Sequence, residues 1–239
     1  MSVIIKRIDK NAMMLFSIVN TYFLADQNQK LLSHLLGDSE HLKRWDGSYA
    51  ASGANTLRFS LYMHVLSELR AIMFDTQPKV ASVHNVIKAL EDTNFKSQLK
   101  KWFSDTKDLN IVSLNGSVSD GSVEFLRVEE ASRKMSAFDY MAEVAIEKYR
   151  ILVTSELGVR VNNARNKMIS HKQFQSTESA GRRAFEATDF GLVYSDAADI
   201  VEQSHDIIFS LYSLFTKAHF DSQSSLKHHE FVANEFWSK

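Results

Sequence analysis

An arginine and a histidine stand six positions apart in the sequence, at Arg165 and His171. A guanidinium group can hold a phosphate through two parallel hydrogen bonds, and an imidazole can exchange a proton near neutral pH. Asn166 and Lys167 follow the arginine directly and add an amide and a second cation. These four residues predict a site for phosphodiester chemistry, where a phosphate is bound and a proton is moved.

The spacing limits how Arg165 and His171 can share one substrate. On a regular helix, six residues leave two side chains about 120° apart, with about 9 Å of rise between them. The pair works as a site if the helix frays before His171, if both groups line a cleft, or if two chains meet across a two-fold axis. The structural alternative is that His171 complements the helix macrodipole and that Arg165 forms a surface or interface ion pair.

The amino-acid composition limits the kinds of protein that this chain can be. Apolar residues make up 44% of the 239 residues and the net charge is -1, which is typical of a globular protein and does not favour one that coats nucleic acid through bulk charge. The chain has no cysteine, which excludes disulfides and cysteine-ligated metals. We expect a cytoplasmic protein with no membrane partner, because nothing resembles a signal peptide and no apolar run approaches the roughly 20 residues that cross a bilayer.

A single proline, Pro78, and only eight glycines favour long helices over a turn-rich sheet. The predicted fold is all-α, one domain over residues 1–239 built as a bundle of long antiparallel helices. Residues 38–53 and 106–122 are predicted to connect helices, and residues 173–187 to form a loop with a short helix. Apolar spacing predicts helices over 8–36, 55–74, 82–90, 95–103, 124–170, from Thr188 onward, and over 224–237.

The longest predicted helix ends at the Arg165–His171 segment, so its apolar face must hold that segment on the bundle. Gly158 interrupts this helix and predicts a bend or a close helix crossing.

Three segments together resemble a known family. Arg165-Asn166-Lys167 followed by His171 is similar to the motif of the HEPN superfamily of helical ribonucleases and nucleotide-binding proteins, in particular its abortive-infection (AbiU-type) branch. Residues 69–75, with Ser82 and an apolar helix after them, resemble an upstream helix end of that branch, and Thr188-Asp189-Phe190 resembles the start of its closing helix. The resemblance covers about residues 55–217 and implies a HEPN-type bundle, to which the rest of the chain adds extra N- and C-terminal helices.

The resemblance implies a metal-independent endoribonuclease that needs no cofactor and acts on RNA as a homodimer. Arg165 would orient the scissile phosphate and stabilise its charge, His171 would act as general base or acid, and Asn166 and Lys167 would support them. The products would carry a cyclic phosphate, and DNA would resist because it lacks the 2′-hydroxyl. Such enzymes serve in phage defence and toxin–antitoxin systems, so an antitoxin protein is an expected partner.

Two other functions remain open at this point. The same fold serves as a non-catalytic nucleotide- or protein-binding module, and the chain could also be the neutralising member of a defence pair.

Other histidines and aromatics give weaker signals. The run His228-His229-Glu230 has no HExxH or cysteine partner, and His34 and His41 straddle Gly37 and would meet only by chance, so no metal is expected. Phe236 and Trp237 are expected on the surface. Aromatics at helical spacing are expected in the core, namely Phe59, Tyr62, Phe209, Tyr212 and Phe215.

Overall fold

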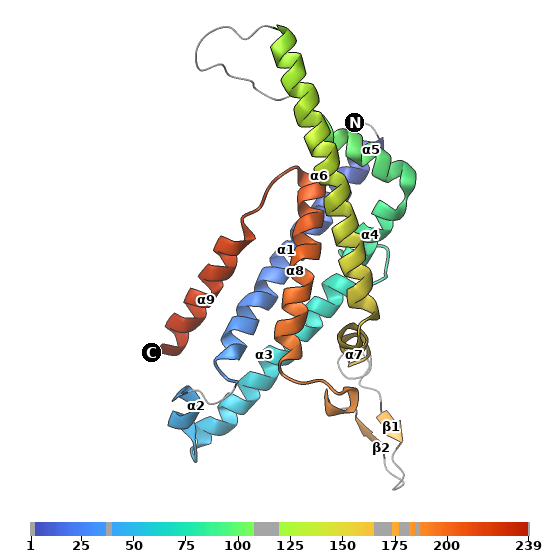
Figure 1. The fold of residues 1–239 in the computed structure, drawn as a ribbon. Coiled ribbons are helices and arrows are strands. Elements are labelled where there is room, and N and C mark those ends of the chain that lie inside the picture. Colours follow the sequence, from blue (N-terminus) through green and yellow to red (C-terminus); the bar gives the residue numbers. More distant parts are fainter. Residues whose placement is uncertain are drawn as a thin grey trace.

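The computed structural model describes residues 3–36, 40–107, 120–164, 174–176, 182–184 and 187–238. These residues are helical apart from a short hairpin and a few turns, which confirms the predicted all-α bundle (Figure 1). The helices are α1 (Val3–Ser33), α2 (Glu40–Trp45), α3 (Tyr49–Phe74), α4 (Val83–Glu91), α5 (Thr93–Ser104), α6 (Asp120–Thr154), α7 (Glu156–Ala164), α8 (Asp196–Thr216) and α9 (Ser222–Ser238), with a 3-10 turn η2 (Ala187–Phe190) before α8.

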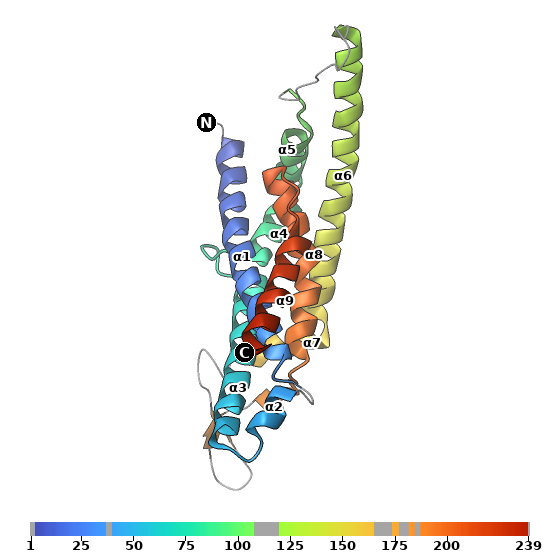
Figure 2. The same ribbon diagram turned by 90° about the vertical axis from the view of Figure 1, so that its left-hand side faces the viewer.

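Four long helices, α1, α3, α6 and α8, run along a common direction and form the body of the molecule (Figures 1 and 2). Their chain direction alternates, since α1 packs against α3 and α8, and α6 packs against α8, each as antiparallel neighbours. Helix α9 lies along α1, and the first turns of α6 extend beyond the ends of the other helices. The predicted arrangement of long antiparallel helices with an added C-terminal helix is therefore present.

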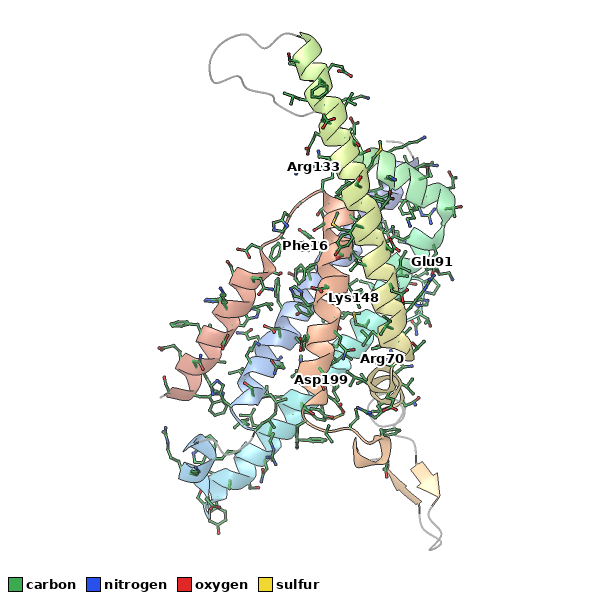
Figure 3. The ribbon with its side chains drawn as sticks, viewed as in Figure 1. Phe16, Arg70, Glu91, Arg133, Lys148 and Asp199 are labelled. Atoms are coloured by element: carbon green, nitrogen blue, oxygen red, sulfur yellow. The ribbon has the colours of Figure 1, made fainter. Side chains whose placement is uncertain are left out.

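The core follows the apolar stripes that the sequence predicts. Leu15 of α1, Leu69 of α3, Phe138 of α6 and Ile207 of α8 are all fully buried and belong to one connected cluster. Ion pairs outside this cluster fasten α6 to its neighbours: Lys148 contacts Asp206 of α8, and Arg150 contacts Glu91 at 3.0 Å. Figure 3 labels one residue of each pair, Lys148 on α6 and Glu91 on α4.

Helix α4 agrees with its prediction to within one residue, and α5 begins two residues earlier than predicted, at Thr93. The hydroxyl of Ser82 accepts a hydrogen bond from the backbone N–H of Asn85 and so caps α4. One carboxylate oxygen of Asp92 accepts the N–H groups of Asn94 and Phe95, both at 3.1 Å, and caps α5. A local side chain thus sets each of these helix starts.

The region between the first two long helices is more helical than predicted. Residues 38–53 were expected to connect, yet they contain α2 and the first turn of α3. The run Tyr49-Ala50-Ala51 includes two strong helix formers, which explains the early start of α3. The ring of Trp45, the last residue of α2, lies 6.0 Å from that of Trp237, so α9 supports the short helix.

The chain after α6 differs most from the prediction. The helix expected over 124–170 divides at Ser155 into α6 and α7. Residues 173–187 were expected to hold a short helix, but they contain strands β1 (Phe174–Ser176) and β2 (Arg182–Ala184), antiparallel with Gln175 opposite Arg183. The helix expected from Thr188 begins only at Asp196, because Gly191 has a φ of +65° and interrupts the helical path.

Four of the five predicted core aromatics lie in or against the core, Tyr212 being partly buried there, and Phe59 does not. Tyr62, Phe209 and Phe215 are buried, but Phe59 is 47% exposed. Trp237, expected on the surface, is 8% exposed because its indole N–H donates to the carbonyl of Leu31 in α1. Over the described ranges, no helix combines the length and apolar composition that crossing a bilayer requires.

Candidate functional site

The four residues predicted to carry the chemistry, Arg165, Asn166, Lys167 and His171, lie outside the described residues. The structure does describe the helix that leads directly into them, since α7 ends at Ala164. The site can therefore be built from the contacts that orient α7 and from the groups that surround its end.

A side-chain cap starts α7 in a new direction after α6. The hydroxyl of Ser155 donates to the carbonyl of Leu152 at 2.8 Å and accepts the N–H of Gly158 at 3.0 Å. A Cβ at Gly158 would lie only 2.1 Å from the carbonyl oxygen of Leu152. Glycine is therefore required at this bend, as the sequence indicated, and Figure 1 shows α7 turning away from the axis of α6.

A buried arginine ties the last turn of α7 to the end of α3. The Nε of Arg70 donates to the side-chain oxygen of Asn162 at 3.1 Å, and its Nη1 lies 3.3 Å from the carboxylate of Asp75. Arg70 is only 9% exposed, and it points toward α7 in Figure 3. Asp75 in turn accepts the backbone N–H of Gln77 at 2.9 Å, so the turn after α3 is part of the same network.

A second arginine ties α7 to the start of α8. The Nη2 of Arg160 lies 2.9 Å from one oxygen of the Asp196 carboxylate, whose other oxygen accepts the backbone N–H of Val193 at 2.9 Å. The Asp196 side chain is 3% exposed, so its charge is neutralised inside the protein rather than by water. Arg70 and Arg160 together fix the position and direction of α7 just before the predicted motif.

Two tyrosines and an arginine complete the surroundings of α7. The rings of Tyr62 in α3 and Tyr194 before α8 lie 4.9 Å apart in an edge-to-face arrangement. The guanidinium carbon of Arg58 lies 5.0 Å from the centre of the Tyr194 ring. Tyr62 is 2% exposed, and its hydroxyl has no hydrogen-bond partner, which costs about 1–3 kcal/mol in a folded protein.

Burial raises the pKa of Tyr62 well above its usual range, and the nearby Asp196 carboxylate adds to the rise. The phenol therefore stays protonated at physiological pH and can only donate to an anion. Sequence patterns did not single out Arg58, Tyr62, Arg160 or Tyr194 as functional residues. Tyr62 and Tyr194 are more than 130 positions apart, so no local spacing links them.

A Ser–His–Asp series joins α8 to α9. The hydroxyl of Ser222 lies 2.9 Å from Nε2 of His205, whose Nδ1 lies 2.9 Å from the carboxylate of Asp206. Backbone amides at this helix start are already used, because the N–H of Ser222 donates to Phe220 and that of Ser224 to Asp221. Ser222 is also only 7% exposed, so the series is best explained as an attachment of α9.

Of the other histidine candidates, His229 makes a structural contact. Nδ1 of His229 lies 2.8 Å from the buried carboxylate of Asp26 in α1, whereas His228 is exposed. No three or more histidine, aspartate or glutamate side chains of the described residues are placed together to hold a metal ion.

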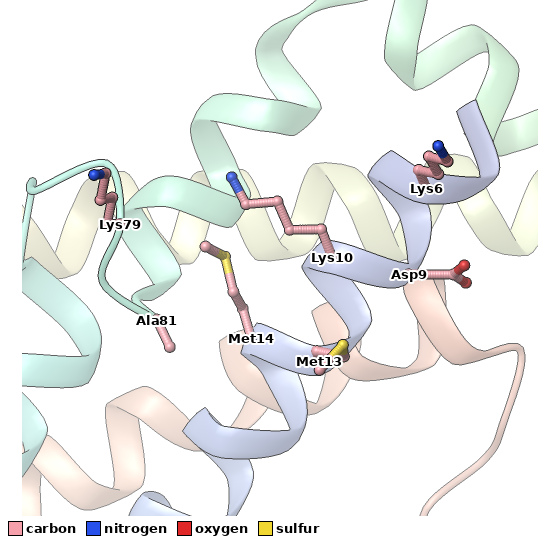
Figure 4. Close-up of a pocket in the computed structure, with 7 residues that line it drawn as sticks. All are labelled: Lys6, Asp9, Lys10, Met13, Met14, Lys79 and Ala81. Atoms are coloured by element: carbon pink, nitrogen blue, oxygen red, sulfur yellow. The ribbon is translucent and has the colours of Figure 1, made fainter. Parts of the chain in front are cut away.

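A shallow hollow of about 480 Å³ lies along the first turns of α1 and the turn before α4 (Figure 4). Lys6, Lys10 and Lys79 border it, and Met13 and Met14 form part of its wall. The three lysines are exposed to water, which screens their charge. This hollow is a weaker candidate for an anion site than the partly buried arginines around α7.

Comparisons with known protein families, with curated proteins and with solved structures found no match to the chain.

Proposed function

We propose that the chain is a metal-independent endoribonuclease of the HEPN type, acting as a homodimer in phage defence or in a toxin–antitoxin system. The observation that carries this proposal is the motif of Arg165, Asn166, Lys167 and His171. The motif follows directly on α7, whose final turns are fixed by two arginine contacts to α3 and α8. A fixed approach of this kind supports a catalytic role, since catalytic groups need rigid placement.

The proposed reaction is an attack of the ribose 2′-oxygen on the adjacent phosphorus. The imidazole of His171 takes the 2′-hydroxyl proton, the 2′-oxygen bonds to phosphorus, and the bond from phosphorus to the 5′-oxygen breaks. The departing 5′-oxygen takes up a proton from water, which leaves a 2′,3′-cyclic phosphate and a 5′-hydroxyl. Arg165 stabilises the charge that builds on the phosphate oxygens, while Asn166 and Lys167 orient the phosphate.

Cleavage by the purified protein is the first test. Labelled RNA should be cut in the presence of EDTA, and DNA of the same sequence should remain intact. Arg165→Ala and His171→Ala should each lower the rate by at least about 100-fold, the usual size of a lost acid–base or charge-stabilising group. The control is Arg133→Ala, which removes an arginine that is 79% exposed on α6. Unchanged cleavage by both site variants would contradict the assignment.

Mixing the two inactive variants tests whether the site spans two chains. If Arg165 of one chain works with His171 of the other, a mixed dimer keeps one intact pair and regains up to about half the activity of a native dimer. If both groups of one site come from a single chain, every site in the mixed dimer lacks one of them and activity stays absent.

Expression in bacteria tests the defence role. Growth arrest that Arg165→Ala and His171→Ala both relieve is expected of a toxin-like ribonuclease. RNA binding without any cleavage would instead favour the non-catalytic module or the neutralising partner.

A further inference from the structure

A partly buried arginine near α7 has no carboxylate partner among the described residues. Arg58 makes no hydrogen bond or ion pair there, and its guanidinium carbon lies 5.0 Å from the centre of the Tyr194 ring. Its Nε is fully buried without an acceptor. In the described part of the chain, the two arginines that fix α7 are neutralised, since Arg70 contacts Asp75 and Arg160 contacts Asp196. Arg58 is therefore an uncompensated positive charge among the described residues of this region.

A second donor without an acceptor lies on the same face of α3. Tyr62 is four residues after Arg58, so the two side chains are neighbours on the helix surface. Its hydroxyl is buried and has no partner, and its ring packs edge-to-face on Tyr194. The side chains of Arg58 and Tyr62 both contact the ring of Tyr194. The cation and the unused hydroxyl are donors that an anionic oxygen would satisfy.

Arg58 and Tyr62 are connected to the proposed cleavage site through Tyr194, Asp196 and α7. Arg160 forms an ion pair with Asp196, which lies two residues after Tyr194. Arg160 also precedes Arg165 by five residues. Even a fully extended chain spans at most about 18 Å over five residues. A few nucleotides of an RNA strand cover a distance of that size, so a strand held at Arg165 can extend toward Tyr194.

We infer that Arg58, Tyr62 and Tyr194 form a subsite for RNA beside the cleavage site, in which Arg58 and the Tyr62 hydroxyl bind a backbone phosphate. Tyr194 holds the guanidinium from one side and leaves its terminal nitrogens for the phosphate. The subsite rests on the proposed ribonuclease function, which makes RNA the ligand. It goes beyond that function by assigning substrate-binding residues on α3 that the Arg165–His171 motif does not include.

Binding of an uncleavable strand separates this subsite from catalysis. The probe is a fluorescent single-stranded RNA with 2′-O-methyl groups, which lacks the attacking hydroxyl, and its Kd is measured by anisotropy at several salt concentrations. Arg58→Gln should raise the Kd about tenfold and lower the slope of log K against log salt by about 0.7, the share of one phosphate contact on a single strand. Arg133→Gln, which changes an exposed arginine on α6, should alter neither quantity.

Tyr62→Phe tests the hydroxyl without emptying the space that the ring fills. Because the hydroxyl has no partner in the free protein, its loss should leave the unfolding midpoint unchanged or raise it. The same variant should raise the Kd for the uncleavable RNA by about three- to tenfold. A wild-type Kd for Tyr62→Phe would remove the hydroxyl from the subsite.

The two proposals fail in different ways. If Arg58→Gln binds RNA no more weakly than Arg133→Gln while Arg165-dependent cleavage persists, the subsite is wrong and the ribonuclease stands. If native protein never cleaves RNA but binds it in an Arg58-dependent manner, the subsite stands and the ribonuclease is wrong.

Discussion

The Nε of Arg70 donates a hydrogen bond to the side-chain oxygen of Asn162 over 3.1 Å, and so joins two residues that are 92 positions apart. The contact connects the end of α3 to the last turn of α7, three residues before Arg165. Arg70 is also paired with Asp75, so one buried guanidinium holds both the turn after α3 and the helix that precedes the proposed catalytic residues.

Replacing Arg70 should therefore cost stability. Arg70→Met keeps the length of the side chain but leaves the Asp75 carboxylate and the Asn162 amide without this donor, and we expect a loss of about 3 kcal/mol in the free energy of unfolding. Urea unfolding followed by circular dichroism measures it. Arg133→Met is the control and should leave the urea midpoint unchanged, because its ion pair with Glu130 is solvent-exposed. Equal midpoints for the two variants would show that the Arg70 contacts contribute nothing.

Alanine substitutions at Gly158, in the bend between α6 and α7, and at Gly53, in α3, should change stability in opposite directions. Gly158→Ala would place a methyl group 2.1 Å from the backbone oxygen of Leu152, so we expect a loss of at least about 2 kcal/mol. Gly53→Ala lies in α3 with no atom within 4 Å of the new Cβ, and should stabilise the protein by about 0.5–1 kcal/mol. Thermal unfolding of both variants tests the pair. A stabilising Gly158→Ala would mean that the close approach to Leu152 does not exist in solution.

How far the sequence predicts this fold depends on how local the determining interactions are. The start of α4 was predictable because Ser82 caps it from within three residues, whereas α5 begins two residues before the predicted Phe95, at a cap formed by Asp92. The hairpin of β1 and β2 was not, since its polar strands lack the alternating pattern of a half-buried sheet. The late start of α8 depends on the positive φ of Gly191, and a glycine alone does not reveal its φ angle.

In the candidate site too, the residues that are close in sequence were predictable and the contacts between separate helices were not. The Arg165–His171 motif is visible because its residues lie within seven positions, and Gly158 was singled out because a glycine is unusual inside a helix. The contacts that support the motif join Arg70 to Asn162 and Arg160 to Asp196, from separate helices. Such pairs depend on how helices pack, so they follow from the tertiary structure and not from spacing.

A buried phenol predicts how stability changes in alkali. Burial raises the pKa of Tyr149 to about 12, and the Glu91 carboxylate adds to the rise. The unfolded chain releases this proton near pH 10, before the folded chain does, so the free energy of unfolding should fall as pH rises from about 10 to 12. Tyr149→Phe should remove part of that fall, measured by urea unfolding at several pH values.

A matched control for this variant lies on the same helix. Tyr140 is 70% exposed, and Tyr140→Phe should keep the full pH dependence of the native protein. At neutral pH, Tyr149→Phe should cost about 1 kcal/mol through its lost hydrogen bond with His84, whose Nδ1 lies 3.0 Å from the hydroxyl. The same decline with pH in all three proteins would rule out Tyr149 as its source.

Replacing each of two adjacent histidines in α9 should change the free energy of unfolding by very different amounts. His229 lies 2.8 Å from the Asp26 carboxylate, which is 3% exposed in α1, whereas His228 is exposed to solvent. His229→Ala leaves a buried carboxylate without this partner, so we expect a loss of about 2–3 kcal/mol, while His228→Ala should be neutral. Hydrogen exchange adds a local measurement, because amides of α9 should lose protection in His229→Ala before those of α1 and α8 do. If α9 keeps native protection in His229→Ala, its attachment must instead come from the other contacts present, namely the Trp237 indole on the Leu31 carbonyl and the Ser222 hydroxyl on His205.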